Sequence, residues 1–426
     1  MARPKRLRTL FLLLLGAAVV ALGGVAWRTD TTLLRRRLVR DIRALVEAED
    51  ARPVQAPPAL PGRFGALAAG PWTALAGLEA DSLDVEFCRA VREGETPLAK
   101  APASCLRELA AGTGPLAALL SATHAAAAGP PLGLGTLDMP APTGNPRTFV
   151  TAAYAARMAA LRLRVELERG EVEAALSTCV DLLALARDTS WGTALEGRLA
   201  ALTVAEVAFL PCAAALDAAP PSAKRRAAAS LATVAEGTPS LAETFSEWSV
   251  AVRAQLFAPY LGEALGTLPE AVRTWAQSPG ALSNKKGFSE ALALGRAWHA
   301  LQARLDAVVE AGGLPPGAAA VRLIALSRGQ ESAFGRLGRL DFPDLGAVAT
   351  SDAHARAELL LLRRAAEVDA LRAETGVWPR AEALPGALRS TEAQPFSLED
   401  KGREAVLRDG SSRRGTVELH LHADGS

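Results

Sequence analysis

Two histidines near the carboxyl end have a spacing that suits metal ligands. His420 and His422 stand two residues apart in a predicted strand, so their rings should lie on one face beside Glu418. Zinc binds imidazole nitrogens and carboxylate oxygens. A metal site also needs supporting groups around its ligands, and a chain terminus is usually mobile. We therefore interpret these residues as a solvated strand face, and we predict neither a metal nor a cofactor for the chain.

Ser283 and Lys286 have the S-x-x-K spacing that resembles penicillin-binding serine enzymes. No K-T-G sequence follows. The surrounding letters, SPGALSNKKG, are typical of a polar loop rather than of the start of a buried helix. We expect a loop here and no serine nucleophile.

The other ionisable candidates favour structural roles. Four acids crowd together without the residue order of a calcium loop, so we expect an exposed acidic face. They are Glu79, Asp81, Asp84 and Glu86. Three further histidines are scattered over helical segments, where they should be ordinary helix residues: His124, His299 and His354.

The elements that must position any site are predicted to be helices. Alanine and leucine dominate the composition, and aromatic residues make up only 5% of it. Apolar spacing and Pro or Gly breaks predict helices over 147–170, 171–188, 191–218, 221–236, 240–265, 288–311 and 351–375. Ser351 and Asp352 are N-cap candidates for the last of these, and Gly376 should end it.

The two helices around Gly170 resemble one tetratricopeptide-like unit, in the stretch from Glu168 to Leu176, where a small-residue turn precedes an alanine- and leucine-rich helix start. Proteins of that family stack several units at a period of about 34 residues, and no second copy occurs here. A single unit implies an antiparallel helix pair that serves packing rather than peptide binding.

The final residues carry the clearest strand pattern. Residues 405–407 could form one strand, Asp409 and Gly410 begin a turn, and 417–422 alternate apolar and polar side chains as a half-buried strand does. We predict a small β-hairpin.

The order of apolar helix, ETGVWP at 374–379 and short β tail resembles the C-terminal part of membrane-anchored bacterial proteins and, more distantly, the helix-to-sheet passage of pseudopilins. A prepilin-peptidase site is missing, because RTL precedes the N-terminal apolar run and no acid follows before Asp30. The resemblance implies an envelope protein near secretion or surface-assembly machinery.

Residues 10–27 form an uncharged apolar run of 18 residues, about the shortest length that crosses a bilayer as a helix. A signal anchor would keep this run in the membrane. A signal peptide would lose it, and Gly24 and Ala26 permit a cut before Trp27. Its full length favours the anchor. We expect one pass through the bacterial inner membrane, with the body in the periplasm.

Basic side chains flank this run. Residues 1–43 carry a formal charge of +8, whereas the remaining residues carry −7. The mildly acidic body argues against nucleic acid as a partner. Five arginines are predicted to contact lipid headgroups, and they are Arg35, Arg36, Arg37, Arg40 and Arg43. The alternative is a plain helical continuation of the anchor.

The four cysteines would meet an oxidising compartment if the body is periplasmic. They are Cys88, Cys105, Cys179 and Cys212. Four cysteines allow three pairings, of which Cys88 with Cys105 is the most local. Buried thiols are the favoured interpretation, because Cys179 lies on an apolar helical stripe.

We therefore predict a mainly α fold, with a single N-terminal transmembrane helix, an irregular helical bundle or solenoid, and a small C-terminal β-hairpin. The expected parts are a cationic tail and anchor over 1–27, a basic juxtamembrane helix and Pro-rich linker over 28–71, a helical body over 72–350 with a loop near 129–146, and a long helix with a β tail over 351–426.

This organisation favours a non-catalytic, membrane-tethered envelope protein that acts as a scaffold or assembly partner. Its expected partners are the lipid bilayer and another envelope protein. The alternative is an envelope hydrolase with a carboxylate or histidine site spread through the fold. Paired carboxylates with raised pKa values in a cleft would favour the hydrolase, and an exposed apolar groove would favour the scaffold.

Overall fold

The protein is described by a computed structural model that covers residues 15–25, 40, 44, 64–79, 88–124, 146–191, 194–249, 252, 288–327, 344–379, 396–402, 404–409 and 417–422. The chain divides into two compact units. The first comprises 1–52, 252–304 and 330–340, and the second comprises 53–251, 305–329 and 341–426. Helices dominate the described part of both units.

The described part of the first unit is helical. Leu15–Val25 is a short apolar helix with exposed side chains, and Arg40 is helical and exposed. The unit also holds the first part of α11 (Phe288–Gly312). Arg35, Arg36, Arg37 and Arg43 lie outside the described residues, as does the rest of the predicted anchor.

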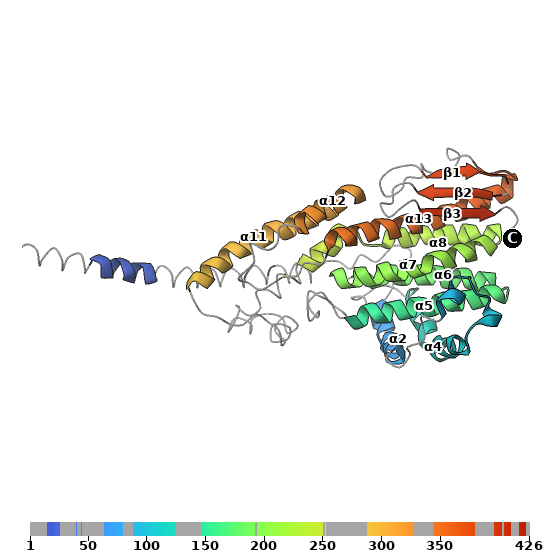
Figure 1. Ribbon diagram of the computed structural model, residues 1–426, viewed down its shortest axis with the longest axis horizontal. Coiled ribbons are helices and arrows are strands. Elements are labelled where there is room, and N and C mark those ends of the chain that lie inside the picture. Colours follow the sequence, from blue (N-terminus) through green and yellow to red (C-terminus); the bar gives the residue numbers. More distant parts are fainter. Residues whose placement is uncertain are drawn as a thin grey trace, which may run out of the picture. The chain divides into compact units, whose positions relative to one another are not determined.

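The second unit is built around a bundle of long helices. These are α5 (Pro146–Glu168), α6 (Val172–Thr189), α7 (Ala194–Ala218) and α8 (Pro221–Gly237). Figure 1 shows them side by side. Gly170 joins α5 to α6 with a φ of 75°, a conformation that glycine adopts without steric cost. Pro221 occupies the first turn of α8, where a missing N–H costs nothing. The antiparallel pair predicted around Gly170 is thus confirmed.

The helix α7 is apolar on nearly all sides and contacts α5, α6 and α13 (Leu345–Thr375). In the described part of the chain, Leu195–Ala218 is the one helix long and apolar enough to cross a membrane, and 56% of its most apolar window is buried inside the protein. A helix that is hydrophobic all round is expected at the centre of a core. We therefore regard α7 as the core helix of the second unit.

A smaller helical lobe packs against α5. It consists of α2 (Phe64–Glu79), α3 (Arg89–Arg92), the 3₁₀ turn Leu98–Lys100 and α4 (Ala103–Ala122). Because α2 begins at Phe64, the predicted linker ends earlier than residue 71, and Pro71 lies inside a helix. The loop predicted near 129–146 lies outside the described residues, apart from Pro146 at the start of α5.

The helix α13 begins earlier than predicted. Asp344 is its N-cap, and its carboxylate accepts a hydrogen bond from the backbone N–H of Ala347 at 3.0 Å. Ser351 and Asp352 are therefore not caps but lie within the helix, and Asp352 is buried. The pattern misled because a polar Ser-Asp pair in a long helix looks like a helix start. Gly376 ends the helix with a φ of 77°, as predicted.

Asp344→Ala should lower the free energy of unfolding by about 1 kcal/mol, because the first turn of α13 loses its side-chain acceptor. Urea unfolding of both proteins, followed by circular dichroism, measures this difference. Asp344→Asn is the matched control, since asparagine also accepts the bond, and its stability should stay close to that of the unchanged protein. Equal losses in both variants would contradict a capping role for Asp344.

The C-terminal strands form a sheet of three strands rather than the predicted hairpin. The strands β1 (Ser397–Asp400), β2 (Glu404–Asp409) and β3 (Val417–His422) pair antiparallel in the order β1-β2-β3. Leu398, Leu407 and Leu419 lie opposite one another on the face that packs toward α13 and α7. The additional strand, with the sequence SLED, carries three polar side chains, so its sequence has no strand pattern.

All four cysteines form disulfides, so the buried-thiol interpretation is wrong. Cys88 is bonded to Cys105 in the small lobe, with 5.5 Å between their Cα atoms. Cys179 of α6 is bonded to Cys212 of α7, with a Cα separation of 5.2 Å. Both pairs are buried, which explains why the apolar surroundings of Cys179 suggested a thiol.

Candidate functional site

The predicted histidine face exists, and the ring of His420 in it bonds carboxylates. Glu418, His420 and His422 share the outer face of β3. The Nδ1 atom of His420 bonds Glu404 of the neighbouring strand, and its Nε2 atom lies 3.6 Å from Glu418. Among the described residues, no group of three or more His, Cys, Asp or Glu side chains is placed to hold a metal ion.

His420 gives this face a pH dependence. Its hydrogen bond with Glu404 raises the pKa of His420. The stabilisation is therefore complete below the ordinary histidine pKa of about 6.5 and is lost as pH rises through the raised value. We expect His420→Gln to lower the thermal midpoint at about pH 5.5 but not at about pH 8.5. His422→Gln serves as the control, and a pH-independent loss in His420→Gln would rule out this origin.

The other sequence candidates fall into two groups. Ser283, Lys286, Asp81, Asp84 and Glu86 lie outside the described residues, while Glu79 is the last residue of α2. The second group consists of three histidines, His124, His299 and His354, which lie on or beside helices.

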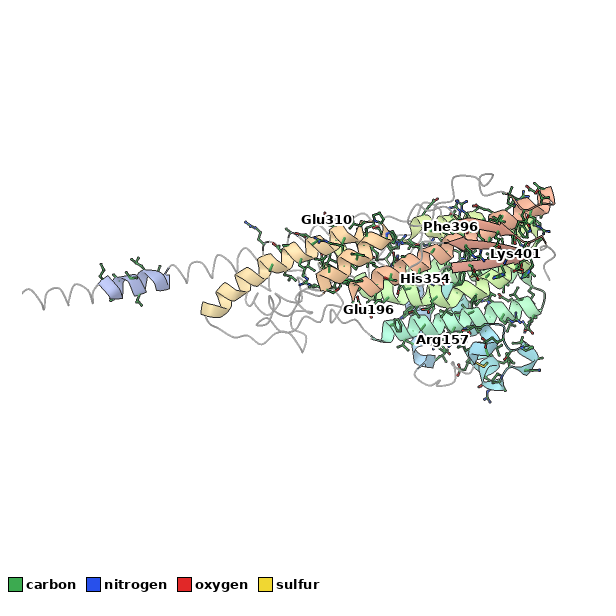
Figure 2. All side chains as sticks on the ribbon, turned by 45° about the horizontal axis from the view of Figure 1, so that its top comes forward. Arg157, Glu196, Glu310, His354, Phe396 and Lys401 are labelled. Carbon is green, nitrogen blue, oxygen red and sulfur yellow. A yellow bond between two sulfur atoms is a disulfide. The ribbon has the colours of Figure 1, made fainter. Side chains whose placement is uncertain are left out.

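His124 follows α4 and bonds Asp181 of α6. His354, labelled on α13 in Figure 2, pairs with Glu358 at 3.2 Å, and His299 belongs to α11. Two of these histidines thus contact carboxylates, which the helical pattern did not indicate.

A pocket between α6, α7, α8 and α13 is the strongest candidate for a binding site. Its volume is about 310 Å³, at the lower end of the range for small-molecule sites. Apolar side chains form most of its wall, and four arginines line it. We call it the arginine pocket, and its arginines are Arg187, Arg198, Arg356 and Arg363.

The pocket arginines are held by buried carboxylates. Arg187 donates two parallel hydrogen bonds to Asp188, at 2.6 and 2.8 Å. Arg198 of α7 donates to one oxygen of Asp352, and the Nε atom of Arg356 donates to the other at 2.9 Å. Arg356 also donates to the carbonyl oxygen of Pro239 at 2.5 Å. One carboxylate of α13 therefore serves two guanidinium groups.

Burial disfavours the charged state of two pocket arginines, Arg198 and Arg356. Desolvation lowers the pKa of Arg198 well below its usual value, and the charge of Arg356 lowers it further. Desolvation lowers the pKa of Arg356 to about 10, although the nearby Glu243 partly offsets this effect. A guanidinium group is not deprotonated in proteins, so both side chains carry a positive charge in a place where a cation is costly. An added anion would be favourable here.

A second hollow, which we call the α7–α13 groove, has a volume of about 300 Å³. Phe149 and Leu199 line it although their side chains are 42% and 36% exposed. Its polar lining comes from Thr203, Glu206, Asp344, Ser351, His354 and Glu358. The groove therefore combines two exposed apolar side chains with a polar lining.

Three carboxyl groups have a pKa that burial raises: Asp181, Asp188 and Asp369. Each bonds a basic side chain, since Asp181 meets His124, Asp188 meets Arg187, and Asp369 accepts from Lys224 at 2.7 Å. They belong to separate contacts, and none of the three lines the arginine pocket or the groove. These groups act as structural counter-ions.

Sequence reasoning missed the arginine pocket because its partners are distant in the chain. Arg198 and Asp352 are 154 residues apart, and nothing local marks them as a pair. An available indication was the placement of Arg187 and Arg198 within otherwise apolar helical segments, where an arginine needs a buried partner. No protein-family model, no curated protein and no solved structure matches this chain.

Proposed function

We propose that the chain is a non-catalytic envelope protein, tethered to the bacterial inner membrane by its N-terminal apolar run, whose periplasmic body docks onto another envelope protein. The pair of disulfides carries this proposal. Disulfides persist in oxidising compartments such as the periplasm and are rare where thiols are kept reduced.

The N-terminal segment supports the tether. Leu15–Val25 is helical and apolar, and its side chains are exposed, as expected for a helix whose side chains contact the lipid bilayer. It belongs to the longer apolar run of residues 10–27. The exposed Arg40 supports contact between the basic segment and anionic headgroups, to which Arg35, Arg36, Arg37 and Arg43 would add.

The docking role is supported by the α7–α13 groove, with its exposed Phe149 and Leu199. A hydrolase would be better supported by carboxylates that share one cleft and perturb each other. The carboxyls of raised pKa instead bond His124, Arg187 and Lys224 in separate places. The scaffold is therefore the function that the geometry favours over the hydrolase.

Two measurements, the membrane topology of the chain and the oxidation state of its cysteines, together test the proposed membrane tether. A reporter active only in the periplasm, fused after Ser426, should be active, and the full-length chain should resist a carbonate wash. Cysteines of the denatured protein should react with maleimide only after reduction. Cys179→Ser, which frees Cys212, is the positive control for labelling. An inactive reporter, or labelling without reductant, would overturn a periplasmic body.

Docking at the groove is tested by a photocrosslinking residue placed at Leu199. We expect one adduct of defined mass in cells, at the expense of free protein. Leu210 is the matched control, because it lies on the same helix, is 56% exposed and does not line the groove. Equal crosslinking at Leu199 and Leu210, or none at either, would remove the groove as the docking surface.

A further inference from the structure

At the inner end of the arginine pocket, two guanidinium groups depend on the same carboxylate. Arg198 and Arg356 share the single carboxylate of Asp352. Arg187 is matched by Asp188, whereas Arg363 shares Glu367 with Arg364, which does not line the pocket. Around Asp352, two guanidinium groups bond one carboxylate. Glu243 lies close enough to Arg356 to raise its pKa, and the exposed Glu236 stands at the rim. Within the described part of the chain, neither acid forms a hydrogen bond or an ion pair with these arginines.

Two buried donors of the pocket have no acceptor among the described residues. These are the Nη1 atom of Arg187 and the Nε atom of Arg198, which belong to residues only 1% and 2% exposed. A buried N–H without an acceptor costs free energy that a ligand oxygen would recover. Guanidinium donors fit the paired oxygens of a carboxylate. The inner end of the pocket therefore offers both charge and donors to an anion.

The rest of the pocket suits a hydrocarbon. Its wall includes Leu183, Leu202, Val234, Leu359 and Leu360. Arg356 and Arg363 are partly exposed, with side chains 26% and 28% accessible, so the pocket reaches the surface. A fully hydrated ion such as phosphate would gain nothing from these leucines, whereas an aliphatic chain would bury its surface against them.

We propose that the arginine pocket binds an aliphatic monocarboxylate of medium chain length, with the carboxylate beside Arg198 and Arg356 and the chain along the leucines of α6, α7 and α13. A ligand carboxylate would give the two guanidinium groups around Asp352 a second acceptor. The modest volume of about 310 Å³ favours a single chain over a lipid with two acyl chains. This activity goes beyond the tether and the docking groove, and depends on neither.

The first experiment compares ligands on the unchanged full chain, held in a neutral amphipol so that no detergent competes. Titration calorimetry with decanoate below its micellar concentration should give saturable binding with about one site per chain. Decanol should bind at least about tenfold more weakly, because it lacks the charge that the guanidinium groups recognise. Acetate and inorganic phosphate should give no measurable heat.

The second experiment uses two matched arginine variants. Arg356→Gln removes a pocket cation whose Nε atom bonds a carboxylate at 2.9 Å. Arg162→Gln removes a partly exposed cation of α5 whose Nε atom bonds Glu166 at 2.7 Å, outside the pocket. Decanoate affinity should fall at least about tenfold in the first and stay within about twofold in the second. Circular dichroism checks that both remain folded, and Arg363→Gln replaces Arg356→Gln if the latter unfolds.

Three results would overturn the assignment. Decanol binding as tightly as decanoate would mean an apolar hollow without anion recognition. Phosphate binding as tightly as decanoate would mean a small-anion site. An unchanged decanoate affinity in the folded pocket variant would place the ligand elsewhere. None of these results bears on topology or on crosslinking at Leu199, so this inference and the proposed function fail separately.

Discussion

Asp352→Asn should lower the free energy of unfolding by about 3–5 kcal/mol, the largest effect we expect from one substitution. Asp352 is 3% exposed and is the shared acceptor of Arg198 and Arg356. Asparagine has nearly the same shape but no charge, so the buried Arg198 and the partly exposed Arg356 would lose the carboxylate that they share. The measurement is urea unfolding at neutral pH, with both proteins fitted to the same two-state equation.

Two controls separate charge from packing in the Asp352 experiment. Asp400→Asn alters an exposed carboxylate that accepts from the backbone of Gly402, and should cost less than about 1 kcal/mol. The double variant Asp352→Leu with Arg198→Met removes both members of the most buried pair and should recover part of the loss. If the double variant is as unstable as the sum of its single substitutions, the ion pair is not the cause.

Removing the disulfide between Cys179 and Cys212 should cost about 2–4 kcal/mol. The bond closes a loop of 33 residues between α6 and α7, the helices at the centre of the bundle. Without this bond the unfolded chain gains conformational freedom. The folded core changes little when alanine replaces both cysteines. Guanidinium unfolding of the double alanine variant should show a lower midpoint.

The second disulfide is the natural comparison. Cys88 and Cys105 are 17 residues apart and belong to a small cluster separate from the main core. A disulfide that closes a loop of half the length removes less entropy from the unfolded chain, and its contribution to the free energy of unfolding is about 0.6 kcal/mol smaller. Replacing both by alanine should therefore destabilise the protein less than loss of the α6–α7 bond. A larger loss here would mean that the small lobe, not the bundle, limits stability.

Much of the helical architecture follows from local rules. The breaks at Gly170, Pro221 and Gly376 could be predicted because a positive φ or a missing N–H acts within a few residues. The strand over 417–422 alternates apolar and polar side chains, and the strand over 404–409 holds the short apolar run of residues 405–407, so local patterns reveal both. These elements needed no knowledge of the distant chain.

The site could not be predicted in this way, because its contacts are long-range. Asp352 looked like a helix cap, although its role is set by Arg198 on another helix. The cysteine pairs were equally hidden, since an apolar helix stripe suits a thiol and a disulfide alike. The strand β1 was missed because its pairing with β2, rather than its own side chains, holds it in place.

The carboxylates of α13 also determine when, during synthesis of the chain, the helical bundle can close. Arg198 and Lys224 enter the nascent chain early, but their partners Asp352 and Asp369 follow 154 and 145 residues later. Until those partners emerge, closing the bundle would bury two cations without compensation. The ribosome must therefore finish α13 before the second unit can close. A truncated mRNA that ends before the codon of residue 352 would yield an incompletely folded chain that remains accessible to proteases. Ordinary proteolysis can therefore remove incomplete copies of the protein.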